Sequence, residues 1–251
     1  PKEKRIDGVA SNWRRKAPDF HVLAVECVAD AGATAFSRTG GLPDGAFEHD
    51  GQLTKRVVRA ATLAALQPYP DALLWDIGAG CGSVSVEWMR AARGALAIAI
   101  EPNAQRRAMI EKNRLTLGVP KLQVISGEAP EALKDLATPD AVFIGGGLTT
   151  KGVFETAWRA LRSGGRLVAN AVTLESEARL IALAENHGGT LVAKSRLGEG
   201  SEAQLIALAA KHGGTLERIA ASEAVPVGRF TAMKPFMTVT QWTVVKDGVV
   251  K

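Results

Sequence analysis

The sequence predicts an α/β fold in which helices cover both faces of a largely parallel sheet. The first observation is an apolar run, Leu73–Ile77, which breaks into three glycines on alternate positions, Gly78, Gly80 and Gly82. Such a run is typical of a buried parallel strand, and the glycines are typical of the tight turn into the next helix. The second observation is another apolar run, Leu96–Ile100, one helix length further on.

The spacing of these glycines indicates the ligand. The dinucleotide fingerprint is G-x-G-x-x-G, whereas this turn reads G-x-G-x-G. That difference points away from NAD and toward S-adenosylmethionine (SAM), which needs a close backbone turn but has no pyrophosphate. Glu101 follows the second strand, where an acidic side chain can accept hydrogen bonds from a ribose diol. We therefore predict a class I SAM-dependent methyltransferase (Rossmann-like) with a seven-stranded sheet, in which Asp76 orients the turn or meets the methionine end of the cofactor.

The later segments alternate between helix and strand patterns, as βαβ units do. A helix is expected after Thr54, its N-cap, and segment 127–130 is expected to open another. The buried face of the first of these helices is predicted from apolar spacing to hold Leu53, Val57, Ala60, Ala61 and Ala64. Further helices are predicted over 83–92, over 103–117 and from 149 or 150 to 161, and further strands over 122–125, 139–144, 166–171 and 238–246.

Composition excludes several classes of protein. With 46% hydrophobic and 23% charged residues, the chain has the balance of a globular protein rather than a disordered one. Two cysteines, Cys27 and Cys81, make no disulfide framework, and no apolar run has membrane length, so we expect a cytoplasmic protein. The net charge of +5 suits an acidic small molecule as well as RNA. The basic residues are scattered, so we expect neither a nucleic-acid nor a membrane partner.

The chain is expected to divide near residue 40. Residues 20–28 form a strand-like run without a sheet of their own, and residues 38–45 form a turn-rich linker. We interpret residues 1–40 as a remnant of a preceding domain with its linker, and residues 41–251 as the SAM-dependent domain. The chain begins at Pro1 rather than Met, so we expect a longer protein.

Several polar residues are candidates for chemistry. His49 and Asp50, in the loop before the first strand, can act as general acid or base, although an exposed polar pair in a loop is more common. Cys81 is expected to line the pocket, but no His or Asn lies near it in sequence to activate it as a nucleophile. Glu128 lies where methyltransferases often hold the adenine amino group.

The fourth predicted strand ends in three glycines, Gly145–Gly147. Enzymes that methylate base or amide nitrogens usually carry an Asn/Asp-Pro-Pro-aromatic box here, to hold the amino group. Three glycines instead leave room for a large flat substrate, and a flexible loop that needs positive φ is an equally compatible reading. At the end of the fifth strand, Asn170 is a better candidate for substrate contact than Thr173.

A tandem repeat follows. Residues 176–184 reappear at 201–209, and each copy continues into His-Gly-Gly-Thr-Leu, at 187–191 and 212–216. Each unit is predicted as a helix, a glycine C-cap and a strand, and the sheet has a place for one of them. The second copy is therefore expected to be an extra. Beyond it, Arg229 and Lys234 are candidates to bind substrate carboxylates.

Taken together, six segments resemble the C-terminal module of the precorrin-6Y C5,15-methyltransferase (decarboxylating) family of cobalamin biosynthesis. They are Gly41–Asp44, Phe47–Lys55, Asp76–Gly82, Gly127–Leu133, Phe143–Gly147 and Asn170–Glu175. The resemblance implies SAM-dependent methylation at C15 of a precorrin, with loss of carbon dioxide from the ring C acetate. It also implies a homo-tetramer, and an N-terminal tetrapyrrole-methylase module of which residues 18–35 resemble the closing strand.

These arguments give a defined set of candidate site residues, with no metal ligand among them. The predicted cofactor-binding residues are Gln52, Leu53, Thr54, Asp76, Gly78, Ala79, Gly80, Gly82, Ser83, Glu101, Pro102, Glu128, Ala129 and Gly145. The candidates for the substrate pocket are His49, Asp50, Lys55, Gly146, Asn170 and Arg229. Two alternatives remain: an enzyme of the same fold that acts on tRNA or protein, and a SAM-binding scaffold made inactive by the duplication.

Overall fold

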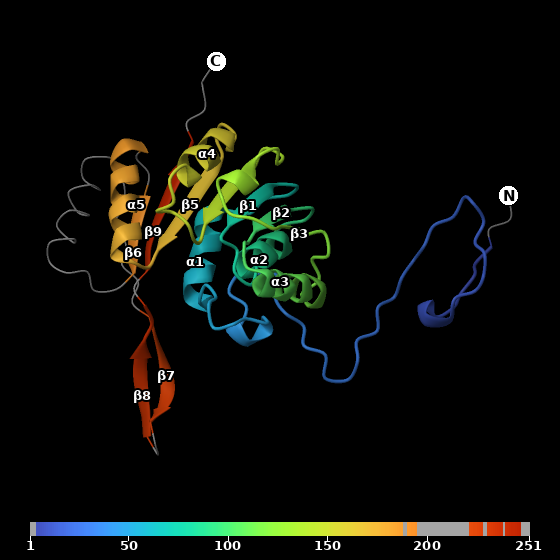
Figure 1. Ribbon diagram of the computed structural model, residues 1–251. Helices are drawn as coiled ribbons and strands as arrows, with labels where there is room; N and C mark the ends of the chain where they lie inside the picture. Colours follow the sequence, from blue (N-terminus) through green and yellow to red (C-terminus); the bar gives the residue numbers. More distant parts are fainter. Residues whose placement is uncertain (1–3, 188–189, 195–220, 228–229, 238, 247–251) are drawn as a thin grey trace. The chain divides into compact units, whose positions relative to one another are not determined.

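The computed structural model describes residues 4–187, 190–194, 221–227, 230–237 and 239–246 (Figure 1). The chain divides into two compact units, Pro1–Phe36 and Ser37–Lys251.

The second unit is built on one sheet with the strand order β3-β2-β1-β4-β5-β9-β6. Its strands are β1 (Leu73–Ile77), β2 (Leu96–Ile100), β3 (Gln123–Ile125), β4 (Ala141–Ile144), β5 (Arg166–Ala171), β6 (Thr190–Lys194) and β9 (Val239–Val245). The first five in chain order pair in parallel, whereas β9 runs antiparallel to both β5 and β6. The predicted α/β fold is confirmed.

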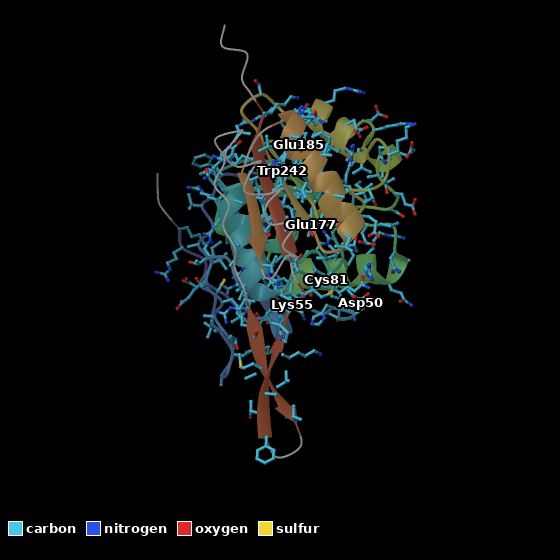
Figure 2. The ribbon with its side chains drawn as sticks, turned by 90° about the vertical axis from the view of Figure 1, so that its left-hand side faces the viewer. Asp50, Lys55, Cys81, Glu177, Glu185 and Trp242 are labelled. Atoms are coloured by element: carbon cyan, nitrogen blue, oxygen red, sulfur yellow. The ribbon has the colours of Figure 1, made fainter. Side chains whose placement is uncertain are left out.

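Helices cover both faces of this sheet. They are α1 (Arg56–Leu66), α2 (Ser83–Ala91), α3 (Ala104–Thr116), α4 (Val153–Ala160) and α5 (Leu174–His187). On one face α1 contacts α2, and α2 contacts α3. On the other face α4 and α5 pack on the main hydrophobic core, which includes Trp242 (Figure 2). The rings of Phe154 and Trp242 lie 5.8 Å apart. Short right-handed crossovers between parallel strands produce this arrangement.

Helix α1 buries a different face from the one predicted. Its buried residues are Val58, Arg59, Thr62, Leu63 and Leu66, whereas Val57 and Ala64 are exposed. Two of the buried residues are polar, so a search for apolar spacing selects the wrong stripe. The expected helix after residue 130 is also only a short 3-10 turn, Glu131–Leu133.

The first copy of the tandem repeat occupies the place in the sheet. It forms α5 and β6, and the hydroxyl of Thr240 on β9 donates to Glu177 on α5 at 3.3 Å. The second copy, over 201–216, lies outside the described residues.

The segment before β9 contains a hairpin that the sequence did not predict. Strand β7 (Ser222–Val227) pairs antiparallel with β8 (Phe230–Pro235), and most of their side chains, including Lys234, are exposed. Without a buried face, these strands lack the alternation of apolar and polar residues that identifies a strand in sequence.

The first unit differs from expectation. Over its described residues, 4–36, the regular structure is one 3-10 turn, Ala10–Asn12. The predicted strand over 20–28 is wrong: this segment has no strand partner among the described residues, and the side chains of Phe20 and Val22 are exposed. Apolar residues alone do not make a strand, because a strand also needs a hydrogen-bonded neighbour. Within the described parts of the chain, no helix is long and apolar enough to span a membrane.

Candidate functional site

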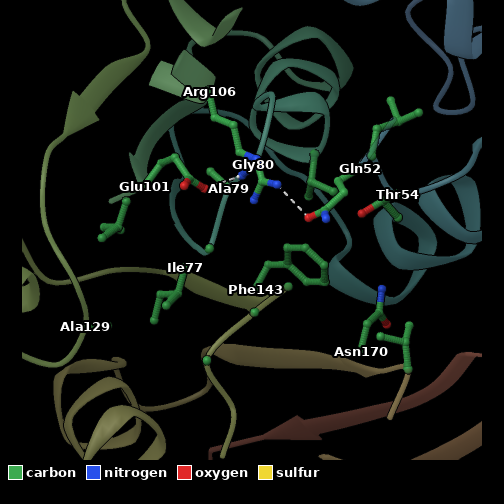
Figure 3. Close-up of a pocket in the computed structure, with 18 of the residues that line it drawn as sticks. Gln52, Thr54, Ile77, Ala79, Gly80, Glu101, Arg106, Ala129, Phe143 and Asn170 are labelled. Carbon is green, nitrogen blue, oxygen red and sulfur yellow. Dashed lines mark hydrogen bonds between the residues drawn. The ribbon is translucent and has the colours of Figure 1, made fainter. Parts of the chain in front are cut away.

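A pocket of about 790 Å³ opens at the carboxyl ends of β1, β2, β4 and β5 (Figure 3). This edge is where open α/β sheets bind ligands. The pocket wall includes the glycine turn after β1, the tip of β2, the segment Gly127–Ala129, the glycines after β4, and the loop before α1.

The glycine turn is held against β2 and against the loop after β4. The N–H groups of Gly78 and Ala79 both donate to the carbonyl of Ile100, at 3.0 and 3.1 Å. Gly78 has φ +72°, and a Cβ on it would lie 2.8 Å from the backbone nitrogen of Gly146. Two stretches of backbone therefore pack directly on each other, which only glycine allows at Gly78. This contact gives the glycines after β4 a structural role, since the turn after β1 packs on Gly146.

Glu101 is buried in the pocket wall and organises the backbone around it. Its two carboxylate oxygens accept hydrogen bonds from the N–H groups of Gly80, at 2.8 Å, and Asn103, at 3.0 Å. A carboxylate has about four acceptor positions, so two remain for the hydroxyls of a ribose. Pro102, Glu128 and Ala129 also line the pocket, which makes this part suitable for a nucleoside.

Asp76 is not in the pocket wall. Its Oδ2 accepts hydrogen bonds from the N–H (3.1 Å) and the hydroxyl (2.6 Å) of Ser85, which holds the first turn of α2. Burial raises the pKa of Asp76 to about 6, against the lowering effect of Ser85. Of its two proposed roles, the geometry supports orientation of the turn. Gly82 and Ser83 are also outside the wall, because Gly82 packs on Ile110, whose Cγ2 would lie 3.1 Å from a Cβ on this glycine.

Cys81 does not line the pocket, contrary to the expectation from its place in the turn. Its side chain is buried, and burial raises the pKa of its thiol to about 11 (Figure 2). A thiol with such a pKa stays protonated at neutral pH and is a poor nucleophile. Among the described residues, no group of three or more His, Cys, Asp or Glu is arranged to hold a metal ion.

The loop before α1 contributes Gln52, Leu53, Thr54 and Lys55 to the pocket wall. His49 and Asp50 do not line the pocket, because their side chains fold back on the loop itself. His49 Nδ1 accepts a hydrogen bond from the N–H of Gly51 at 3.0 Å, and Asp50 Oδ1 accepts one from the N–H of Gln52 at 3.0 Å.

Arg106 on α3 fastens this loop over the pocket. Its guanidinium donates to Asp50 Oδ2 at 2.8 Å. It also donates to Gln52 Oε1 at 2.6 Å (Figure 3). The hydrogen bond from Arg106 is the main reason why the pKa of Asp50 lies below its usual value. Arg106 was not among the predicted site residues, although it lines the pocket. The sequence near Arg106 gives no signal for this contact, because the loop lies more than 50 residues away.

A buried ion pair between α1 and α2 also holds the same loop in place. Arg59 on α1 donates to Glu87 on α2 at 2.6 Å, and neither side chain is exposed to solvent beyond 2%. Arg59 also contacts Asp44 at 3.1 Å and the carbonyls of Leu42 and Thr54. The resemblance segment at 41–44 therefore serves to fix the position of the loop.

The remaining pocket wall is more apolar. It includes Phe143 on β4, Asn170 on β5, Val172 beyond it, Phe236 and Met237. Of the predicted residues, Gly145 and Gly146 also reach the wall, in addition to Lys55. Arg229 lies outside the described residues. The pocket thus has one part suited to a nucleoside and another suited to a large, mostly apolar molecule.

The sequence is similar to those of known proteins. The profile of a family described as "Precorrin methyltransferase domain" matches residues 45–198 and 196–246. Precorrin-6Y C(5,15)-methyltransferase (decarboxylating) from Sinorhizobium sp is 47% identical over 224 residues, which are 89% of this chain and 48% of that protein. This chain therefore spans about half the length of that relative.

Two further matches are shorter proteins. "Probable cobalt-precorrin-6B C(15)-methyltransferase (decarboxylating)" from Pyrobaculum calidifontis is 35% identical over 153 residues, 59% of this chain and 78% of that protein. The crystal structure of the C-terminal domain of precorrin-6Y C5,15-methyltransferase from Rhodobacter capsulatus matches with a TM-score of 0.68 and 42% identity, over 84% of this chain and 100% of that one. This chain belongs to the precorrin methyltransferase domain family.

Proposed function

We propose that this chain uses SAM to methylate C15 of a precorrin and to release carbon dioxide from the ring C acetate, in cobalamin biosynthesis. One observation carries the assignment to C15. The relative from Pyrobaculum calidifontis, of which the chain covers 78%, is named only for C15 methylation and decarboxylation. The name of the longer relative includes C5 as well, and this chain spans 48% of that relative. The shared part is therefore best assigned to C15.

The pocket residues fit SAM. Gly78 and Gly80 line the pocket with backbone alone, and Glu101 keeps free acceptor positions for a ribose. Glu128 and Ala129 line the pocket, and we propose that they contact the adenine. When bound, SAM supplies an electrophilic methyl group on a sulfonium centre.

The protein's own part in methylation is to bind and orient. The meso carbon of a precorrin is an electron-rich enamine carbon, so holding it against the methyl donor can suffice without a protein nucleophile. The raised pKa of Cys81 agrees with this reading. Apolar residues such as Phe143 and Val172 line part of the pocket, where they can shield a bound substrate from water. Desolvation of a carboxylate there favours its loss as carbon dioxide, with the electron pair passing into the conjugated ring.

The test is anaerobic incubation of the chain with SAM and precorrin-6B, followed by mass spectrometry. The expected product has gained one methyl group and lost one carbon dioxide. A product with the methyl group alone would separate the two reactions and contradict the decarboxylating role. No reaction despite SAM binding would favour the alternative of an inactive scaffold. The extra copy of the repeat supports that alternative, because the family profile matches in two segments that meet between the two copies.

The wider setting follows from the same proposal. In the full-length protein we expect a second, N-terminal methylase module, a homo-tetrameric assembly and a cytoplasmic location. Size-exclusion chromatography with light scattering tests the assembly, since a monomeric mass would contradict it.

A further inference from the structure

A closed set of hydrogen bonds fixes the side chain of Asn170 at the pocket wall. The hydroxyl of Thr62 on α1 donates to the carbonyl of Val58 at 2.9 Å. The same hydroxyl oxygen lies 3.1 Å from Asn170 Nδ2 and 2.8 Å from Gln241 Nε2 on β9. Gln241 Nε2 also lies 2.8 Å from Asn170 Oδ1. Thr62 and Gln241 are almost fully buried, with 0% and 2% of their surface exposed.

These contacts decide which way the Asn170 amide points. A hydroxyl has one hydrogen, and Thr62 uses it for Val58, so it can only accept from the two amide groups. Both amides must therefore turn their NH₂ groups toward Thr62. Gln241 then uses its second N–H for Asn170, and the atom that receives it must be the Asn170 oxygen. The orientation follows from the network and not from an arbitrary choice between oxygen and nitrogen.

One donor is left over. Asn170 donates one N–H to Thr62, and its oxygen accepts a hydrogen bond from Gln241. Its second N–H has no partner among the described residues. Asn170 is half-buried, lines the pocket, and points into it (Figure 3). Buried polar networks are costly unless satisfied, so a network of this kind holding a single free N–H at a pocket wall is a fixed hydrogen-bond donor.

We propose, resting on the proposed function, that Asn170 donates this N–H to a carboxylate oxygen of the tetrapyrrole. The bound carboxylate is one that the product keeps. A donor stabilises the charge on a carboxylate and so opposes its loss as carbon dioxide, whereas the departing acetate needs the apolar part of the wall. Lys55, also in the wall and 3.9 Å from Asp44, offers a cationic partner for another retained carboxylate. Asn170 is thus a specificity residue that sets the orientation of the ring.

The experiment compares Asn170→Ala and Asn170→Asp with the unaltered chain. Affinity for precorrin-6B and for S-adenosylhomocysteine is measured separately, by absorbance titration and by calorimetry. Both variants are expected to weaken precorrin-6B binding, Asn170→Ala by about tenfold, the scale of a lost charge-assisted hydrogen bond. Asn170→Asp should bind more weakly still, because its carboxylate repels that of the substrate. Affinity for S-adenosylhomocysteine should stay unchanged.

Two controls separate substrate binding from folding. Thr62→Val removes the acceptor that orients the amide without touching the pocket wall, so it should also weaken precorrin-6B binding, and Thr62→Ser should restore it. If Asn170 were only structural, the nearly isosteric Asn170→Asp would bind better than Asn170→Ala, which would overturn the assignment. Equal binding by all variants would overturn it too. Failure of the unaltered chain to convert precorrin-6B would instead count against the proposed function.

Discussion

The contact between Gly78 and Gly146 gives the sharpest prediction about the cofactor turn. In Gly78→Ala, the new Cβ would lie 2.8 Å from the nitrogen and 2.9 Å from the Cα of Gly146. These are backbone atoms, so no side chain can rotate away to relieve the clash. The φ of +72° adds strain of about 1–2 kcal/mol for a residue with a Cβ. Overpacking adds about 1–3 kcal/mol, so we expect a total loss of about 2–5 kcal/mol in the free energy of unfolding.

Gly147→Ala is the matched control. Gly147 has nearly the same φ, +79°, but a Cβ there would meet only the Thr150 hydroxyl, at 3.9 Å. Gly147→Ala should therefore lose only what the backbone strain costs, about 1–2 kcal/mol in the free energy of unfolding. Urea denaturation measures both values, and calorimetry with S-adenosylhomocysteine should show weaker binding for Gly78→Ala, because the turn must shift. Equal stability and equal affinity of the two variants would refute the reasoning from close backbone contact.

Three further predictions concern carboxylates. Glu87→Ala leaves the buried Arg59 without its main partner and should cost about 3–5 kcal/mol in urea denaturation. Glu111→Ala breaks a partly exposed pair with Arg114 and should cost less than about 1 kcal/mol. Similar losses would contradict the buried pairing. Asp76 has a folded-state pKa of about 6, above its ordinary 3.8, so the stability it contributes is present below about pH 4 and is lost as pH rises through 6. Asp76→Asn should lack this loss, and parallel pH profiles of unfolding for both proteins would argue against the raised pKa. Glu101→Ala should weaken S-adenosylhomocysteine binding by at least about 1 kcal/mol in calorimetry, and unchanged affinity would defeat the ribose assignment.

Much of the fold and of the cofactor part of the pocket could be predicted from the sequence. Buried parallel strands are nearly continuous apolar runs, and a glycine turn after such a strand has few other uses, so both have local signals. Glu101, Gly80 and Gln52 accordingly reach the pocket wall. The strand predicted over 20–28 is wrong, because a strand also needs a partner and apolar residues in one segment cannot show whether a partner strand is present.

The sequence by itself determined the class of the protein, its family and the strands and glycine turn that make the pocket. It did so because apolar runs and glycines at required positive φ act within a few residues of each other. The predicted helix starts were less accurate: α1 follows Lys55 and not Thr54, α4 follows Gly152 and not residue 149 or 150, and neither helix has a side-chain cap. Only the tertiary structure decided how the pocket is held together: Arg59 with Glu87, Arg106 with the loop at 50–52, and Asn170 with Thr62 and Gln241. These partners come from separate elements. In the sequence, a polar residue that is buried or that bridges two elements cannot be distinguished from a surface residue unless its partner is known. Their pairing therefore depends on the packing of the sheet and its helices, which no local pattern specifies.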